Sequence, residues 1–303
     1  MRKINCFLVV LALLVTFAGC NQKEKKLEKI TEGISQAQWY LINEIAASAF
    51  DKNVHPSSSF TYRNDTLMFE IVIDTLTEGK VKQAKNGEKL LKNYLLTALC
   101  CENSPVKELF SQIAEAPTHL KLFYGDSSEK EKIIMLVSGT EIRDALAKEY
   151  GQRNVLENYF EWLSFYEFDE DEEFNVSSCF EKINEKDYIV VEYASDSMLS
   201  YIDEKVNFDI DNAKDNFLID IDDIVDFDKY KNKISEKYRE EIAEYIKEEY
   251  VEEGGLFDNK YIPELMQKTN VGLIFRLKDK SSGKPMDVVI ESNEFLGEKN
   301  SEK

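Results

Sequence analysis

Part of the chain occurs twice, and this self-similarity limits the possible folds more than any other feature of the sequence. Residues 53–74 and 175–196 share nine identities over twenty aligned positions once His55-Pro56 are skipped in the first copy and two residues are skipped in the second. Residues 118–142 and 269–295 follow in the same order, each as two β-rich runs around a polar connection. A repeated order of elements indicates that one structural unit has been duplicated.

Hydrophobic spacing predicts the elements of the first copy. Apolar residues recur at helical intervals over residues 31–49 and 90–99, and a further short helix is expected over 106–114. The runs on either side of Asn64-Asp65 predict a hairpin, because these two residues favour a turn. Two strands after the last helix complete this copy.

The second copy follows the same order. Residues 141–167 predict a helix, and the runs at 179–183 and 188–193 predict a hairpin. A long helix then carries one apolar stripe and ends at Gly254-Gly255. Its stripe consists of Ile242, Tyr245, Ile246 and Tyr250. A short helix over 261–267 and a final hairpin complete the copy.

The sequence therefore predicts an α+β protein built as a tandem duplication of an α-β-β-α-β-β module. The modules span residues 31–142 and 143–295, and residues 296–303 form a polar tail. Adjacent β-rich runs with short connections predict antiparallel sheets of four strands, with the helices on one face. The two sheets could stay separate or join edge to edge, which would hide exposed strand edges.

The N-terminus has the features of an export signal. Arg2 and Lys3 precede an almost wholly apolar run over residues 4–17, and polar residues follow Cys20 at once. The apolar run is too short to span a bilayer with margin. Residues 1–19 are therefore predicted to be a secretory signal peptide that is removed on export.

The end of this signal resembles the lipobox of bacterial lipoproteins. Ala18 and Gly19 stand directly before Cys20, with Phe17 where leucine is usual. The resemblance implies cleavage before Cys20 and a diacylglycerol on its sulfur, followed by a tether over residues 20–30. A cysteine with two or three acyl chains anchors stably to a membrane. Together with the Lys-, Glu-, Asn- and Ile-rich composition, the motif resembles Bacteroidetes lipoproteins, which implies a cell-envelope location, with the outer membrane as the expected site.

The charge balance excludes one class of partner. The chain has 38 Lys and Arg against 58 Asp and Glu, a net charge of −20. Such a surface repels phosphate groups, so binding to nucleic acid is not expected. The membrane contact predicted for this protein runs through the lipid on Cys20 instead.

The second copy contains an acidic insertion over about residues 197–228. Candidate Ca²⁺ ligands there are Asp209, Asp211, Asp220 and Asp222, because hard cations prefer clustered carboxylate oxygens. The EF-hand pattern fails, since Ala213 occupies its fifth position and Asp220 its twelfth. A solvated acidic edge that discourages strand pairing is the favoured interpretation.

Catalytic signatures are absent from the sequence. There is no nucleophile elbow, P-loop, dinucleotide-binding or HExxH motif. His55 and His119 are the only histidines, too few for a His-based zinc site. Glu70 and Glu192 align and could face a shared groove, although the solvent face of a strand is the simpler explanation. No catalytic residue and no cofactor are predicted.

Three cysteines remain if Cys20 is lipidated, namely Cys100, Cys101 and Cys179. An odd number leaves at least one free thiol. Buried structural thiols are expected, and nothing in the sequence supports a Cys100–Cys179 disulfide.

Three functions fit these features. The favoured one is a non-catalytic lipoprotein that binds an unknown protein, small molecule or glycan. The alternatives are a Ca²⁺-stabilised structural or assembly factor of the envelope, and a hydrolase whose acidic site is not visible in the sequence. The first is favoured because nothing positive supports the other two.

Overall fold

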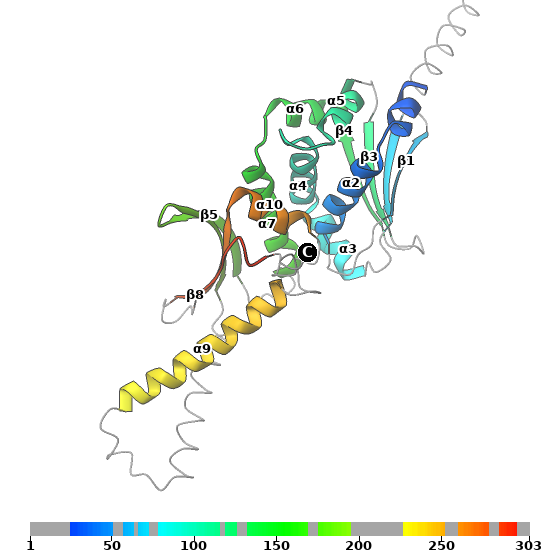
Figure 1. Ribbon diagram of the computed structural model, residues 1–303. Helices are drawn as coiled ribbons and strands as arrows, with labels where there is room; N and C mark the ends of the chain where they lie inside the picture. The colour runs from blue at the N-terminus through cyan, green and yellow to red at the C-terminus, as the bar shows by residue number, and fades with distance from the viewer. Residues whose placement is uncertain are drawn as a thin grey trace, which may run out of the picture. The chain divides into compact units, whose positions relative to one another are not determined.

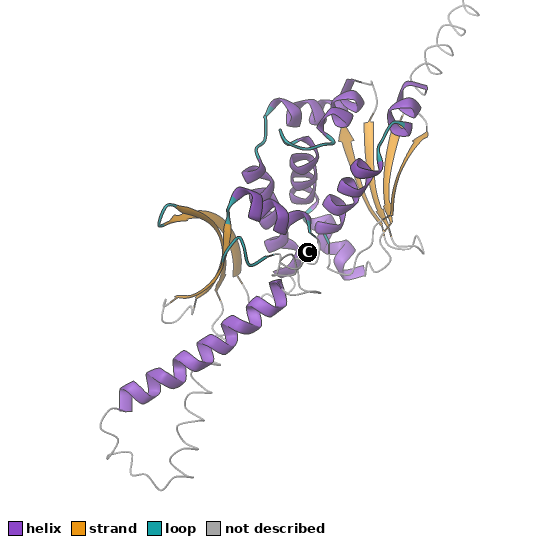
Figure 2. Cartoon of the chain, in the orientation of Figure 1, coloured by secondary structure: helices purple, strands orange, loops and turns teal. Residues whose placement is uncertain are grey.

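The computed structural model describes residues 25–50, 57–63, 66–72, 78–115, 119–125, 132–168, 175–194, 227–251, 260–278 and 285–295. The protein is α+β, as predicted, and its helices and strands are shown in Figures 1 and 2. The chain divides into two compact units, residues 1–158 and 159–303. The division falls within a helix rather than at residue 142, the expected end of the first module.

The described part of the first unit begins with a helix over residues 25–32, in which Leu27 is buried. Part of the expected tether is therefore helical. Ser35 starts the next helix with a capping box, because its hydroxyl accepts from the Gln38 N–H while the Gln38 side chain accepts from the Ser35 N–H. The elements that follow are α2 Gln36–Ser48, β1 Ser57–Arg63, β2 Thr66–Val72, α3 Glu78–Asn86, α4 Glu88–Cys100, α5 Lys107–Glu115, β3 His119–Gly125, β4 Lys132–Ser138 and α6 Gly139–Ala147.

The rest of the chain repeats a similar succession. Its elements are α7 Gln152–Phe168, β5 Asn175–Ile183, β6 Lys186–Ala194, α9 Phe227–Val251, α10 Tyr261–Thr269, β7 Gly272–Lys278 and β8 Pro285–Ile290. The predicted helices and hairpins are confirmed in these positions, with two differences. The helix expected over 141–167 is two helices, because Glu149 takes a left-handed conformation with φ 49° and ends the first. α3 was not predicted, since only Val81, Gln83 and Ala84 of its mostly polar sequence are buried.

Each unit contains a four-stranded sheet, with strand orders β1-β2-β3-β4 and β5-β6-β7-β8. The predicted hairpins pair antiparallel in both sheets. The prediction of wholly antiparallel sheets is wrong, because the central pairs β2–β3 and β6–β7 are parallel. In the first sheet the connection from β2 to β3 runs through three helices, and such a crossover joins parallel neighbours.

The first sheet is buried on one face. Along β4, Ile133, Met135 and Val137 are buried, whereas Ile134 and Leu136 between them are exposed. Along β2, Leu67, Phe69 and Ile71 are buried in the same alternating way. This period of two agrees with helices that cover only one side of the sheet.

The second sheet buries its inner face and part of its outer face. The inner face carries Ile189, Val191, Leu273, Phe275, Val288 and Ile290, all 2% exposed or less. On the opposite face of the central strands, Val190 and Ile274 are also buried, and they cluster with Tyr188. The polar residues described below lie beside these two side chains on the outer face.

Candidate functional site on the outer face of the second sheet

Several residues singled out in the sequence lie outside the described part of the chain. These are Cys20, His55 and the candidate Ca²⁺ ligands Asp209, Asp211, Asp220 and Asp222. Lipidation and cation binding therefore stay predictions. Within the described residues, no group of three or more His, Cys, Asp or Glu side chains is placed to hold a metal ion.

The three cysteines expected to be buried differ in environment. Cys100 and Cys101 are buried and free, as predicted, and burial raises the pKa of Cys100 to about 12. Cys179 is free but exposed, so the prediction is wrong there. The reason is that Cys179 lies on β5, an edge strand, with its side chain on the outer face.

Glu70 and Glu192 do not occupy equivalent positions. Both hairpins have two-residue connections, closed by the pairs Arg63–Thr66 and Ile183–Lys186. When the hairpins are matched by their turns, Glu70 corresponds to Val190 rather than to Glu192. The two-residue gap in the sequence alignment is therefore wrong within the second strand, and the two carboxylates define no shared groove.

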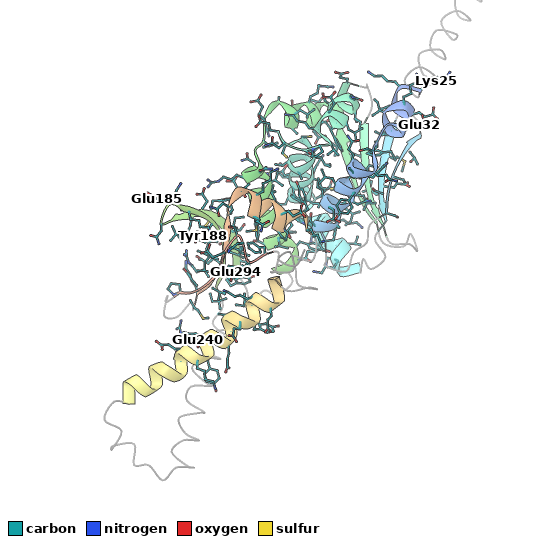
Figure 3. The ribbon with its side chains drawn as sticks, viewed as in Figure 1. Lys25, Glu32, Glu185, Tyr188, Glu240 and Glu294 are labelled. Carbon is teal, nitrogen blue, oxygen red and sulfur yellow. The ribbon has the colours of Figure 1, made fainter. Side chains whose placement is uncertain are left out.

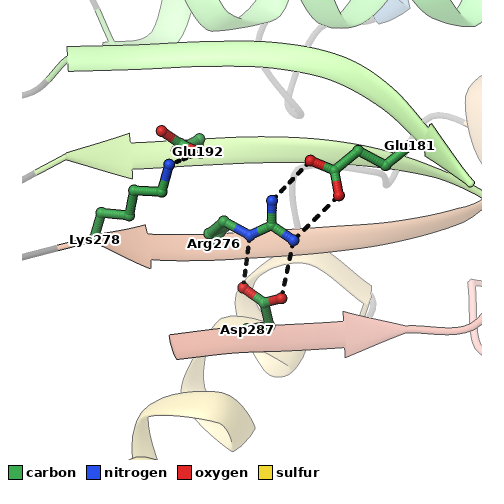
Figure 4. A network of polar contacts seen from close by, with 5 residues as sticks. All are labelled: Glu181, Glu192, Arg276, Lys278 and Asp287. Atoms are coloured by element: carbon green, nitrogen blue, oxygen red, sulfur yellow. Dashed lines mark hydrogen bonds and ion pairs between the residues drawn. The ribbon is translucent and has the colours of Figure 1, made fainter. Parts of the chain in front are cut away.

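Arg276 is the centre of a polar network on the outer face (Figure 4). Its guanidinium binds Asp287 through two bonds, Nε–Oδ1 at 2.9 Å and Nη2–Oδ2 at 3.1 Å. It also binds Glu181, with Nη1–Oε1 at 2.7 Å and Nη2–Oε2 at 3.3 Å. Two bidentate carboxylates hold the planar fork of an arginine in one orientation. The hydrogen bonds that Arg276 donates to Asp287 and Glu181 raise its pKa, so it stays charged.

This network ties three strands together. Arg276 lies opposite Glu192 on β6 and opposite Asp287 on β8, whereas Glu181 comes from β5. The bond between Arg276 and Glu181 therefore passes over the row that contains Val190 and Ile274. The side chain of Arg276 is only 17% exposed, and its apolar stem helps to explain why those two residues are buried.

A second ion pair extends the charged face. Lys278 Nζ lies 2.6 Å from Glu192 Oε2, next to the Arg276 network on β7 and β6. Together, the Arg276 network and the Lys278–Glu192 pair contain three carboxylates and two cations. Each charged side chain of this face has a partner of opposite sign within the described residues, which makes the face rigid rather than reactive.

Tyr188 and Gly272 form a tight contact at one end of the same face. A Cβ on Gly272 would lie 2.5 Å from the ring of Tyr188, so glycine is required where the two strands pair. Tyr188 donates to Glu291 Oε1 at 3.0 Å, and Lys186 forms an ion pair with Glu291. The bond from Lys186 lowers the pKa of Glu291. Figure 3 labels Tyr188 on the sheet and Glu185 at the adjacent turn.

Cys179 is the one cysteine on the described part of this face. Burial raises the pKa of its thiol, and the nearby carboxylates of Glu181 and Glu192 raise it further. The thiolate is the reactive form of cysteine, so this environment suppresses its nucleophilicity. The geometry supports rigid presentation of a surface and offers no activated thiol.

The outer face of the first sheet has the opposite character. Ile134 is 45% exposed and Leu136 is 60% exposed. Beside them, Lys92 Nζ donates to the Leu136 carbonyl at 2.6 Å and lies 2.6 Å from Glu141 Oε1. Lys92 therefore occupies a hydrogen-bonding position at the open side of the edge strand β4.

Comparisons of this chain with protein-family models, with curated proteins and with solved structures find no match. No activity, ligand or cofactor can therefore be carried over from a relative. Of the described helices, none combines the length and the apolar character needed to cross a membrane. The function has to follow from the residues themselves.

Proposed function

We propose that this protein is an exported lipoprotein, anchored to the cell envelope through Cys20, that binds a partner and catalyses no reaction. The outer membrane is the proposed site. The anchor is supported by the basic Arg2 and Lys3, the apolar run after them and the small residues before Cys20. The lipid on Cys20 would hold the two units at a membrane surface.

The observation that carries the binding function is the pair of exposed aliphatic side chains Ile134 and Leu136. Soluble proteins bury most apolar side chains, and neighbouring exposed ones mark interaction surfaces. The pair is aliphatic, and stacking on a sugar ring requires an aromatic face. A protein partner with apolar side chains therefore fits this surface better than a glycan.

Substitution of Cys20 tests the anchor. A Cys20→Ser variant is expected to lose incorporation of a clickable fatty acid in living cells and to leave the membrane fraction. Cys179→Ser is the matched control and is expected to retain both. Unchanged labelling and membrane retention in Cys20→Ser would show that the sequence before residue 20 does not direct lipidation of this cysteine.

We also propose that the two units arose by tandem duplication of one module. Both sheets have the same strand order and the same pattern of strand directions. Matching the hairpins by their turns aligns the row Phe69–Leu122–Met135 with the row Ile189–Leu273–Ile290. Phe69, Met135 and all three residues of the second row are buried, as expected if the rows fill equivalent places in two cores.

A further inference from the structure

A lysine and a glutamate from two helices meet at the end of the strand β4. Lys92 on α4 donates from Nζ to the Leu136 carbonyl at 2.6 Å, and the same Nζ lies 2.6 Å from Glu141 Oε1 on α6. The other carboxylate oxygen, Glu141 Oε2, accepts from the Ser138 N–H at 2.7 Å. The Lys92–Glu141 pair therefore binds one backbone carbonyl and one backbone N–H of the same strand.

Both of these backbone groups point away from β3, the neighbour of β4 in the sheet. In an antiparallel ladder, residues that bond to the neighbouring strand through both N–H and C=O alternate with residues that direct both groups away from it. Leu136 and Ser138 are two positions apart on β4, so they share one direction. The bonds to Lys92 and to Glu141 agree that this direction is away from β3. The pair consequently lies along the edge of β4.

The two bonds resemble those that an added strand would make. In a parallel ladder, one residue of the added strand donates its N–H to the carbonyl before a given position and accepts from the N–H after it. Leu136 and Ser138 stand in this relation, on either side of Val137. Lys92 supplies the donor and Glu141 the acceptor. Together the two side chains bind the strand as one residue of a neighbouring strand would.

A similar arrangement occurs in the second sheet at the end of its edge strand β8. The Glu291 N–H donates to Glu294 Oε2, and Lys247 on α9 donates to Glu294 Oε1 at 3.0 Å. Both α4 and α9 lie between the two hairpins of their own unit. In each unit, a lysine of such a helix therefore binds a glutamate that holds a backbone N–H at the end of the last strand. The recurrence indicates that the contact in the first unit is not incidental.

We propose that the Lys92–Glu141 pair closes the edge of β4 against the addition of another strand. Edge strands are templates for pairing with other chains, and lysine is among the residues that proteins place there to prevent it. The position is accessible, since Leu136 is 60% exposed and the Glu141 side chain 43% exposed. An incoming strand has to break the bonds of Lys92 and Glu141 before it forms its own. This closure does not depend on whether a partner binds the face of the sheet.

Loss of the Lys92 ammonium tests the closure in solution. Lys92→Met keeps an apolar stem and loses the donor. Self-association of the full chain, measured by sedimentation in mild detergent, is expected to strengthen roughly two- to twelve-fold for each hydrogen bond that an incoming strand no longer has to break. Lys92→Arg keeps a donor and is expected to associate no more than the unchanged chain. Lys89→Met is the matched control for charge, because Lys89 is exposed on the same helix.

A destabilised chain can also associate, and Ser138→Ala separates this effect from an opened edge. The substitution removes the hydroxyl that caps α6, and loss of such a cap lowers stability. It leaves Lys92, Glu141 and the backbone N–H of position 138 in place. Ser138→Ala is therefore expected to unfold at a lower urea concentration without associating more strongly than the unchanged chain.

Amide hydrogen exchange locates the contact. The Leu136 N–H points the same way as the Leu136 carbonyl, so a strand added to β4 would bind it. Its exchange in the Lys92→Met chain is expected to be slower in the associated sample than in a dilute one, whereas a contact across the face of the sheet leaves this amide unbound. Association of Lys92→Met no stronger than that of Lys89→Met overturns the proposal. Stronger association without slower exchange at Leu136, or equal strengthening in Ser138→Ala, overturns it as well.

Discussion

The two sheets share one topology but present different outer faces. On the first, Ile134 and Leu136 are exposed. On the second, Arg276 and Lys278 are paired with carboxylates, and Val190 and Ile274 beside them are buried. The inner faces are apolar in both sheets, because burial there stabilises the fold. The fold therefore constrains the inner face, whereas the outer face is free to differ in function.

The contrast continues at a pair of equivalent positions. The second sheet has Tyr188 opposite Gly272, and the corresponding register in the first sheet places Met68 opposite Lys121. The tyrosine ring lies so close to its neighbour that any side chain there would clash. The glycine of the second sheet is therefore a local consequence of the tyrosine and not a requirement of the shared topology.

Core substitutions are expected to have the largest effects and to be alike in the two sheets. Met135→Ala and Ile290→Ala each remove a fully buried side chain and are expected to lower the free energy of unfolding of their own unit by about 2–5 kcal/mol. Urea unfolding followed by circular dichroism measures this loss. If only one of the two variants is destabilised, the rows are not equivalent and the duplication proposal fails.

Gly272→Ala is expected to have the next largest effect. Its methyl group would overlap the Tyr188 ring, and overpacking of this kind costs about 1–3 kcal/mol. A double variant with Tyr188→Ala should be less destabilised than the sum of the two single variants, because the ring no longer opposes the methyl group. If the losses in unfolding free energy of the two single variants simply add in the double variant, the Tyr188 ring does not restrict the side chain at position 272.

The charged network is expected to contribute less than the core. Arg276→Met leaves Glu181 and Asp287 without their cation, and it is expected to lower the free energy of unfolding by about 1–3 kcal/mol, below the cost for fully buried pairs because both carboxylates are partly exposed. Lys278→Met is the matched control and should cost about 0–1 kcal/mol. Equal losses for the two variants would show that the double bidentate geometry adds nothing.

Local periodicity was sufficient to predict most of the fold. The apolar stripe of α4 and the alternation of apolar and other residues in β2 and β4 are properties of single segments. They can therefore be recognised without knowing which helices or strands these segments pack against. The direction of the central strand pair is different, because it depends on how a chain of helices returns to the sheet. Helices separate the two hairpins in the sequence, which is typical of a crossover between parallel strands, whereas the short connections within each hairpin indicate only the antiparallel pairs.

The charged face was missed for a similar reason. Arg276 and Lys278 alternate with apolar residues on β7, and Asp287 does so on β8, which is a signal of a half-polar strand. Which carboxylate would reach Arg276 depends on the register of three strands, and the sequence does not contain that register explicitly. The chain has 58 acidic residues, so the sequence does not distinguish the few whose carboxylates bind Arg276 and Lys278.

The pH dependence of Cys179 alkylation tests how the charges on the outer face of the second sheet act on its thiol. Because burial and the carboxylates of Glu181 and Glu192 raise its pKa, the thiol stays protonated to higher pH than an ordinary free cysteine, whose pKa is about 8.5. The pH at which alkylation by iodoacetamide reaches half its maximal rate is therefore expected to lie above that value. Glu192→Gln should move it downward, because one negative charge near the thiolate is removed. A midpoint that does not move would show that Glu192 does not contribute to the raised pKa of Cys179.

The smallest effect on stability is expected on the outer face of the first sheet. Ile134→Gln and Leu136→Gln replace exposed side chains, and such changes alter the free energy of unfolding by about 0.5 kcal/mol or less. Met135→Gln, one residue away but buried, should be strongly destabilising and serves as the contrast. If Ile134 and Leu136 form the surface that receives a partner, the double glutamine variant should also bind less of an apolar fluorescent dye while it unfolds at the same urea concentration. Unchanged dye binding at unchanged stability would remove this face from the proposed function and leave the charged face of the second sheet as the surface that distinguishes the protein.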